Sequence, residues 1–290
     1  MSDSNSRIVV LGSINMDLIT RTASLPDPGE TVLGTSFTTA PGGKGANQAI
    51  AAAKAGSPVA FIGAIGDDDF GTTLRNTLTS AGIDDSALRT AAGSSGIAAI
   101  TVDDRAENSI VVVPGANGGV RDLTDDDRTL IADADILLCQ LEIPLDTVVA
   151  AFEYAHSHGV ITILNPSPVQ DLPDALVSNT DVLVVNEAEE ARVGHRANGV
   201  EHVITTLGAR GARYRGAQSF EVPAPRVEAV DTTGAGDAFA GALAARWPTG
   251  PRSAVEWATA AGSFAATRPG ASASSGTPAE IETLRDGAAR

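Results

Sequence analysis

The sequence predicts an α/β protein with a doubly wound, mostly parallel sheet flanked by helices. Short β-branched runs alternate along the chain with longer, Ala-rich segments of helical pattern. Hydrophobic residues make up 43% of the 290 residues, which is enough to bury a sizeable core. Only 4% of the residues are aromatic, and Ala, Val, Leu and Ile dominate instead. Such a composition is typical of helices packed on a sheet that is buried on both faces.

The expected elements follow from these runs in chain order. The expected strands are Ile8–Ile14, Val59–Ile65, Ile136–Leu141, Ile161–Leu164, Val182–Val185 and Val203–Thr206. The expected helices are Ala46–Ala55, Phe70–Ser80, Asp125–Ile131, Leu145–His156, Ala238–Ala245 and Ser253–Thr267. Strands separated by helices connect through right-handed crossovers, so the strands should pair in parallel. The connection Ala191–Glu201 has only eleven residues, so we expect at most a short or irregular helix there.

Two segments interrupt the alternation of strands and helices. Glu30–Ala40 and Ile97–Val113 are strand-like without intervening helices, and Asp103–Asn108 is a plausible turn within the second. Such insertions predict a small antiparallel flap. We therefore expect a single domain over residues 1–290, with a lid formed by about 15–40 and 97–113. The Ser-rich segment Ala271–Gly276 is predicted as a loop.

The formal charge of −16 argues against nucleic acid and anionic membranes as partners, because both are polyanions. Any nucleotide site must offset this field locally. The single cysteine, Cys139, lies in an apolar run and cannot form an internal disulfide. The polar start Met1–Arg7 has no apolar signal-peptide core, and no run approaches the ~18 apolar residues that span a bilayer. We expect a cytoplasmic protein with no membrane partner.

The segment Asp231–Phe239 has the features of a phosphoryl-transfer site. Gly234 and Gly236 precede a helical pattern, so backbone N–H groups and the helix dipole can converge on one anion. Aligned donors of this kind stabilise the charge that spreads over a phosphoryl group in transfer. Asp237 falls in the first helical turn, where its carboxylate can accept a proton from an attacking hydroxyl. An N-cap is an equally good interpretation of Asp237 from this segment alone.

Polar residues also follow several predicted strands. Glu142, Asn165 and Asn186 each end a strand, in keeping with the rule that open α/β sheets bind ligands beyond their carboxyl ends. The glycine-rich Gly42–Asn47 opens a helical pattern, and its glycines allow close backbone approach. It is not a Walker A loop, because Gly45 and not Ser or Thr follows the lysine. A plain glycine turn before an Ala-rich helix is the alternative.

Five motifs together resemble one family. Asp231-Thr-Thr-Gly-Ala-Gly-Asp237 and Gly42-Gly-Lys-Gly-Ala-Asn47-Gln-Ala resemble the C-terminal and N-terminal signatures of the PfkB family of carbohydrate kinases. Three further motifs resemble those of its ribokinase-like members: Gly12-Ser-Ile-Asn15-Met-Asp17, Gln140-Leu-Glu142 and Thr206-Leu-Gly-Ala-Arg-Gly211. The likeness runs from about Ile8 to Ser274 in the same order. Five ordered motifs are far more specific than any one of them.

The resemblance implies a ribokinase-like fold and a set of site residues. Asp237 would be the catalytic base, with an anion hole formed by Gly234, Ala235 and Gly236. The residues implied for the sugar are Asn15, Asp17, Gly43, Lys44, Asn47, Glu142 and Asp237. Those implied for ATP are Asn186, Thr206, Leu207, Gly208, Ala209, Arg210, Gly211 and Gly236.

The resemblance also implies two metal ions. Asn186 and Glu189 would hold the Mg²⁺ of Mg·ATP, mostly through water, since magnesium accepts few protein carboxylates. A K⁺ loop would be built from Asp231, Thr233, Ala265, Arg268, Gly270 and Ser274. The acidic run Glu187–Glu190 has a second interpretation as a favourable first helical turn, and Thr206–Gly211 as a glycine hairpin. The short Ala191–Glu201 connection departs from the longer crossover typical of the family.

The expected activity is transfer of the γ-phosphate of ATP to a primary hydroxyl of a small sugar, with D-ribose as the first-choice acceptor. A kinase of a nucleoside or of another small sugar is an alternative with the same phosphate chemistry. A non-catalytic sugar or nucleotide sensor on the same scaffold is the alternative from another class. A homodimer that pairs through the edges of the lid is also expected.

Overall fold

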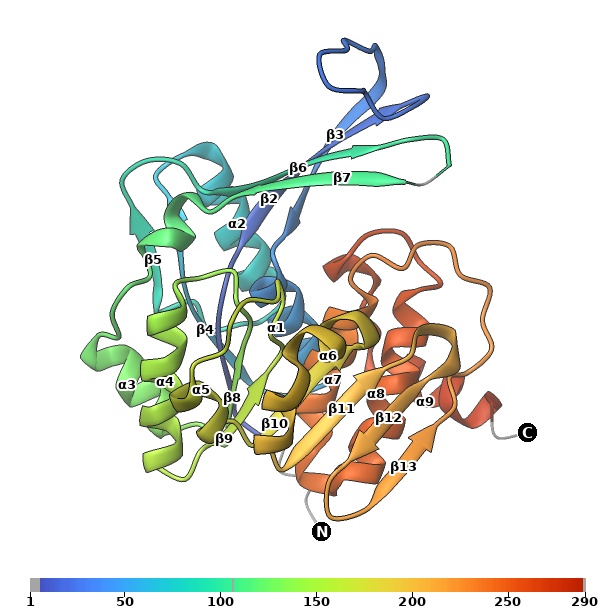
Figure 1. The fold of residues 1–290 in the computed structure, drawn as a ribbon. Helices are drawn as coiled ribbons and strands as arrows, with labels where there is room; N and C mark the ends of the chain where they lie inside the picture. The colour runs from blue at the N-terminus through green and yellow to red at the C-terminus, as the bar shows by residue number, and fades with distance from the viewer. Residues whose placement is uncertain (1–5, 106, 289–290) are drawn as a thin grey trace.

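The computed structural model describes residues 6–105 and 107–288, and its main body is built on one large sheet (Figure 1). In spatial order this nine-stranded sheet contains β13 (Ser219–Val222), β12 (Ala212–Arg215), β11 (His202–Thr206), β10 (Val182–Asn186), β9 (Ile161–Leu164), β8 (Ile136–Cys139), β1 (Ile8–Leu11), β4 (Val59–Gly66) and β5 (Leu88–Ala91). Strands from β11 to β5 pair in parallel, and β12 and β13 add an antiparallel edge. The predicted doubly wound fold is confirmed.

Helices cover both faces of this sheet. One layer contains α1 (Lys44–Lys54), α2 (Asp69–Ser80), α7 (Ala235–Arg246), α8 (Pro251–Ala265) and α9 (Pro278–Ala288). The other contains α3 (Asp125–Ala132), α4 (Leu145–Ser157), α5 (Asp174–Ser178) and α6 (Glu187–Val193). Because successive side chains of a strand point to opposite faces, β8 sends Ile136 and Leu138 into the first layer and Leu137 and Cys139 into the second. This explains why its sequence is apolar at every position.

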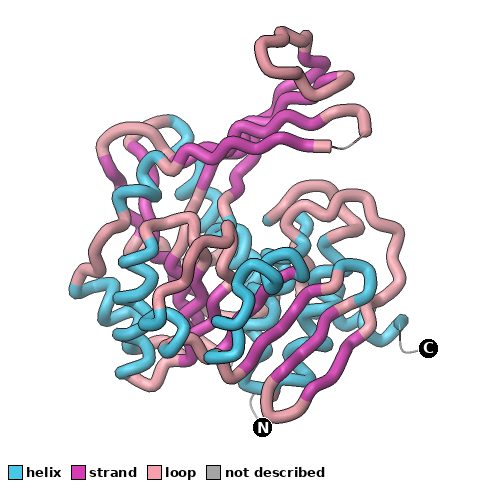
Figure 2. The backbone as a smooth tube through the Cα atoms, in the orientation of Figure 1, coloured by secondary structure: helices cyan, strands magenta, loops and turns pink. Residues whose placement is uncertain are grey.

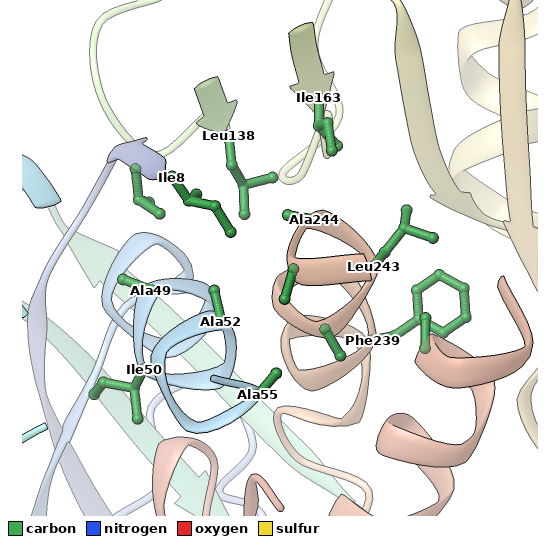
Figure 3. Packing of buried hydrophobic residues seen from close by; sticks show 14 of the residues in the cluster. Ile8, Ala49, Ile50, Ala52, Ala55, Leu138, Ile163, Phe239, Leu243 and Ala244 are labelled. Carbon is green, nitrogen blue, oxygen red and sulfur yellow. The ribbon is translucent and has the colours of Figure 1, made fainter. Parts of the chain in front are cut away.

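Helices α1 and α7 lie side by side against the sheet (Figure 3). Their contact is built from small residues such as Ala49, Ala52 and Ala244, under Ile8 and Leu138 of the strands. Gly241 of α7 permits the close approach, because a Cβ atom there would lie 2.3 Å from the Gln48 carbonyl oxygen of α1. The Ala-rich sequences thus serve to bring two helix N-termini together.

A second, four-stranded sheet projects beyond the main body (Figure 1). Its order is β3 (Gly34–Gly42), β2 (Asn15–Thr22), β6 (Gly96–Val102) and β7 (Asn108–Val113). The β3–β2 and β6–β7 pairs are antiparallel, but β2 and β6 pair in parallel. The expectation of an antiparallel flap was therefore wrong in part. Two hairpins from distant parts of the chain meet here, and the direction in which they meet is a tertiary outcome.

Most other predicted elements are present within a few residues of the expected bounds (Figure 2). The 191–201 connection is irregular, as expected, because α6 ends at Val193 and a 3₁₀ helix follows over Gly194–Gly199. The stretch Glu30–Leu33 is loop and not strand, and the 271–276 loop includes a 3₁₀ turn at Ser272–Ser274. Cys139 is buried and free. Among the helices described, none is long and apolar enough to cross a membrane.

Candidate active site

The carboxyl ends of the parallel strands meet the N-termini of α1 and α7 at one edge of the sheet. Asn165, after β9, donates from Nδ2 to the Val184 carbonyl of β10 at 2.9 Å and accepts from Gln48 of α1 at 3.0 Å. A cavity of about 130 Å³ opens here. It is lined by Lys44, Asn165, Val184, Val185, Asn186, Glu189, Thr206, Gly234, Gly236 and Asp237. Residues predicted for the sugar, for catalysis and for ATP therefore share one cavity.

Asp237 lies in the first turn of α7 with only 8% of its surface exposed. Its Oδ2 accepts from Asn47 Nδ2 at 3.1 Å, and its Oδ1 accepts from Gln48 Nε2 at 2.9 Å. The N-cap of α7 is Gly234, in the left-handed conformation at φ 75°. The alternative interpretation of Asp237 as a helix cap is therefore wrong: its carboxylate faces α1 and the cavity.

The residues predicted for the anion hole, Gly234, Ala235 and Gly236, directly precede Asp237 in the chain. Gly234 and Gly236 both line the cavity. The Ala235 N–H donates to the Thr232 carbonyl at 3.2 Å, which closes the turn before the helix. The next two amides belong to the first turn of α7, where a helix offers its N–H groups no carbonyl partner. The amides of Gly236 and Asp237 are thus the donors best placed for an anion.

Lys44 and Glu142 form the side of the site next to α1. Glu142 Oε2 accepts from the Lys44 N–H at 3.0 Å and from the Ser13 hydroxyl at 2.5 Å, so a strand-end carboxylate fixes the start of α1. Burial lowers the pKa of Lys44, but the carboxylates of Asp237, Glu142 and Glu189 outweigh it, and the net pKa is raised. The ammonium group stays charged and supplies the local cation that a nucleotide site needs in this acidic protein.

Asp17 extends the same cluster of carboxylates. Burial, together with the neighbouring charges of Glu142 and Asp237, raises the pKa of Asp17 to about 7. Asn47 has a second feature of a ligand site, since its buried Oδ1 has no hydrogen-bond donor among the described residues. Acceptors and donors on neighbouring groups are what a vicinal diol needs.

Asn15 is placed differently from Asp17. It is buried, and its Oδ1 accepts from Asn117 Nδ2 at 2.7 Å. Asn117 also bridges Ile14, accepting from its N–H at 3.0 Å and donating to its carbonyl at 3.1 Å. The Asn117 side chain thus fixes the backbone between β1 and β2. Sequence reasoning missed Asn117, although the Gly-rich stretch around it is a signal of a tight, functional turn.

Asn186 and Glu189 form a reciprocal capping box at the start of α6. Asn186 Oδ1 accepts from the Glu189 N–H at 2.9 Å, and Glu189 Oε2 accepts from the Asn186 N–H at 2.8 Å. The interpretation of Glu187–Glu190 as a first helical turn is therefore confirmed for the backbone. Glu189 also lines the cavity, and one carboxylate and one amide oxygen fit a magnesium ion that keeps most of its waters. No cluster of three or more His, Cys, Asp or Glu residues suited to a metal occurs in the described ranges.

The loop from Thr206 to Gly211 joins β11 to β12 as a hairpin. Thr206 pairs with Ala212, and the Leu207 N–H donates to the Gly211 carbonyl at 2.8 Å. Thr206 lines the cavity, whereas Arg210 points to an ion pair with Glu187 at 2.6 Å. The glycine-hairpin interpretation is right for the backbone, and contact of Leu207–Gly211 with a nucleotide stays a prediction.

Most residues predicted for K⁺ lie on two loops that Asp231 joins, whereas Ala265 is the last residue of α8. The Asp231 carboxylate accepts from the Thr233 N–H at 2.9 Å and from the Gly270 N–H at 3.0 Å. Burial alone would raise the pKa of Asp231, but these bonds hold it below its usual range. Ser274 is fully buried and donates to the Ala271 carbonyl. A carboxylate among loop carbonyls suits a large, weakly hydrated cation, while the Arg268 side chain pairs instead with Glu280.

A larger cavity of about 920 Å³ lies elsewhere, between the 223–226 segment and α8 and α9. Its lining is mainly apolar and includes Pro223, Phe264 and Leu284. None of the site residues predicted from the sequence lines it. The chemistry therefore belongs to the smaller cavity, where charged and polar groups converge.

Comparisons with known proteins agree with this geometry. The family described as pfkB family carbohydrate kinase matches residues 5–278. Ribokinase of Haemophilus influenzae is 38% identical over 299 residues, covering 96% of this chain and 97% of its own. The structure of ribokinase from Thermotoga maritima matches with a TM-score of 0.89 at 33% identity, over 97% of this chain and 99% of that one.

A third relative was solved with ligands. Ribokinase of Arabidopsis thaliana, complexed with ribose and ATP, matches with a TM-score of 0.89 at 28% identity, over 97% of this chain and 99% of that one. The family match and these relatives, together with the carboxylate in the first turn of α7, identify the chain as a phosphotransferase with an alcohol acceptor. More narrowly, the chain belongs to the pfkB family of carbohydrate kinases.

Proposed function

We propose that the protein transfers the γ-phosphate of ATP to the primary hydroxyl of D-ribose, giving D-ribose 5-phosphate and ADP. The observation that carries this proposal is the cavity in which Asp237, Lys44, Gly236 and Thr206 meet. It joins a buried carboxylate, a cation and a helix N-terminus, which are the three groups that phosphoryl transfer to an alcohol needs. Ribose as acceptor is supported by relatives named ribokinase that align over nearly the whole chain.

In this proposal Asp237 accepts the proton of the sugar hydroxyl. The sugar oxygen then forms a bond to the γ-phosphorus, while the bond from phosphorus to the bridging oxygen breaks and ADP leaves. The first-turn amides of α7 and the Lys44 ammonium face the oxygens that gain negative charge. Asp17, Asn47 and Glu142 orient the other sugar hydroxyls. Asn15, the first residue of β2, stays a predicted sugar contact. Gly43, at φ 89°, turns the chain into α1, whose Lys44 lines the cavity and whose Asn47 contacts Asp237.

We further propose that ATP lies along the loops at Asn186 and at Thr206–Gly211, with its triphosphate toward Gly236. Glu189 and Asn186 would bind the magnesium ion carried by the phosphates, which neutralises charge as the transfer proceeds. K⁺ would bind between the 231–233 and 265–274 loops, next to the anion hole. A cytoplasmic location, where ATP is available, belongs to the same proposal.

The small sheet supports a homodimer. Strand β7 is an edge strand, and Ile110, Val111, Val112 and Val113 are between 44% and 62% exposed. On the opposite edge strand, Phe37 is 61% exposed. Consecutive exposed apolar residues on a free edge mark a surface that another strand covers. We propose that the small sheet of a second copy of this chain covers it.

An acceptor panel tests the proposed function. ADP release would be measured with D-ribose, a second small sugar and a nucleoside, each with and without K⁺ and with Mg²⁺ present throughout. We expect the highest kcat/KM with ribose and a rise in rate on adding K⁺. A higher kcat/KM with the nucleoside would favour the first alternative, and no ADP release with any acceptor would favour a sensor.

A further inference from the structure

Gln48 is a fully buried glutamine directly behind the proposed catalytic carboxylate. It lies in the first turns of α1, and 0% of its surface is exposed. Its Nε2 donates to Asp237 Oδ1 at 2.9 Å and to Asn165 Oδ1 at 3.0 Å. Its Oε1 accepts from Gln140 Nε2 at 2.6 Å. One amide thus contacts the ends of β8 and β9 and the start of α7.

The neighbours of Gln48 allow only one orientation of its amide. Asn165 donates from Nδ2 to the Val184 carbonyl, so its oxygen end must face Gln48. Gln140 presents its NH₂ group to the other end. If the Gln48 amide turned over, its oxygen would face two acceptor oxygens and its NH₂ group would face the NH₂ group of Gln140. Gln140 and Asn165 therefore keep a donor aimed at Asp237.

This donor complements the one from Asn47. Asn47 contacts Asp237 Oδ2 and Gln48 contacts Oδ1, so both carboxylate oxygens are bonded to α1. With both bonds present the carboxylate cannot rotate, and each oxygen keeps one fixed direction toward the cavity. Gln48 is fully buried and is not one of the residues that line the cavity, so it acts on the reaction only through Asp237.

We propose that Gln48 is a positioning residue for the proton-accepting carboxylate of Asp237, and that Gln140 supports Gln48 by donating to its oxygen. The proposal rests on the proposed function, in which Asp237 is the base. A proton acceptor that is misplaced by a fraction of an ångström loses alignment with the attacking hydroxyl, and misplacement by 1 Å costs up to about 100-fold in rate. The role should therefore appear in turnover and not in sugar affinity.

Gln48→Met tests the first half, because methionine has a similar length and no donor. We expect kcat with ribose to fall by about 10- to 100-fold while the KM for ribose stays unchanged. Gln218→Met, at an exposed turn, is the matched control and should keep full kcat. Melting temperatures of both variants report the folded fraction. Full kcat in folded Gln48→Met overturns the proposal, as does a loss confined to KM.

Gln140→Met tests the second half without touching Gln48. It removes the donor to Gln48 Oε1, so the Gln48 amide keeps its bonds to Asp237 and Asn165 but loses the contact that holds its other end. We expect a smaller loss of kcat than in Gln48→Met, and no further loss when the two are combined. A combined loss equal to the product of the single losses would show independent roles and overturn the proposal.

A crystal structure of Gln48→Met separates this inference from the proposed function. We expect the Asp237 carboxylate to rotate or to occupy more than one orientation, whatever the acceptor proves to be. An Asp237 carboxylate that keeps its place without Gln48 overturns the inference even if the enzyme phosphorylates ribose. Conversely, a wild-type enzyme that releases no ADP with ribose rejects the proposed acceptor while this structural result still decides the role of Gln48.

Discussion

Gly234 lies with its backbone directly against Ala271. A Cβ atom on Gly234 would come within 2.6 Å of the Ala271 Cα, and the residue has φ 75°. The turn that opens α7 is therefore packed on the loop that carries Gly270 and Ser274, with Asp231 hydrogen-bonded across the two. We therefore expect the 268–274 loop and the turn that opens α7 to be coupled through this contact.

Gly234→Ala should reduce both stability and turnover. An alanine in the left-handed conformation costs about 1–2 kcal/mol, and its methyl group must also displace the 271 backbone. We expect a lower urea midpoint and a lower kcat, because the first-turn amides move with the turn. Gly119→Ala, where an added Cβ meets no atom within 4 Å, is the control. An unchanged urea midpoint would show that the loop yields freely and would contradict the coupling.

Asp237→Asn should abolish most turnover but leave sugar binding in place. The amide keeps the size of the side chain but cannot accept the proton, and loss of a positioned base costs about 10²–10⁴-fold in rate. Turnover would be measured by ADP release and sugar binding by calorimetry. Asp126→Asn, exposed on the first turn of α3, provides the comparison. Near wild-type turnover in Asp237→Asn would reject the assignment of the base.

The raised pKa of Asp17 should make the stability of the protein depend on pH. This pKa is about 7 in the folded protein against an ordinary 3.8, so between these values the folded state binds a proton that the unfolded state has lost. The contribution of Asp17 to stability is therefore full below about pH 4 and is lost as pH rises through about 7. Asp17→Asn removes this loss.

The measurement is thermal melting of Asp17→Asn and wild type from pH 5 to pH 8. We expect the melting temperature of Asp17→Asn, relative to that of wild type, to increase as pH rises. Asp104→Asn, in the exposed turn after β6, is the control and should show the same pH dependence as wild type. Parallel melting curves for Asp17→Asn and wild type would show that the carboxyl titrates normally.

Val111→Lys should separate the proposed dimer. Val111 is 62% exposed on the edge strand β7, and a charge there must be desolvated if another strand covers it. Light scattering should give a dimer mass for wild type and a monomer mass for the variant, while Thr79→Lys on α2 should remain dimeric. A monomeric wild-type protein at micromolar concentration would reject the dimer.

The alternation of strands and helices was readable from the sequence because burial on both faces demands continuous apolar strands such as Ile136–Cys139. The polar residues that follow β8 and β9 or end β10 were readable for a related reason. Parallel strands end at one edge of the sheet, so Glu142, Asn165 and Asn186 were expected at that edge. Asp237 was recognisable by its motif, and only its alternative as a helix cap needed the coordinates.

What the sequence by itself determined is the set of local choices: where strands and helices form, where glycines break them, and which polar residues stand at their ends. Tertiary structure alone decided which of these groups meet. Asp237 bonds to Asn47 and Gln48, about 190 residues away, because small side chains let α1 and α7 approach closely. Asn117 reaches Ile14 across 103 residues, and β2 meets β6 in parallel. Local pattern carries no information on such contacts, since they depend on how complete helices and hairpins pack.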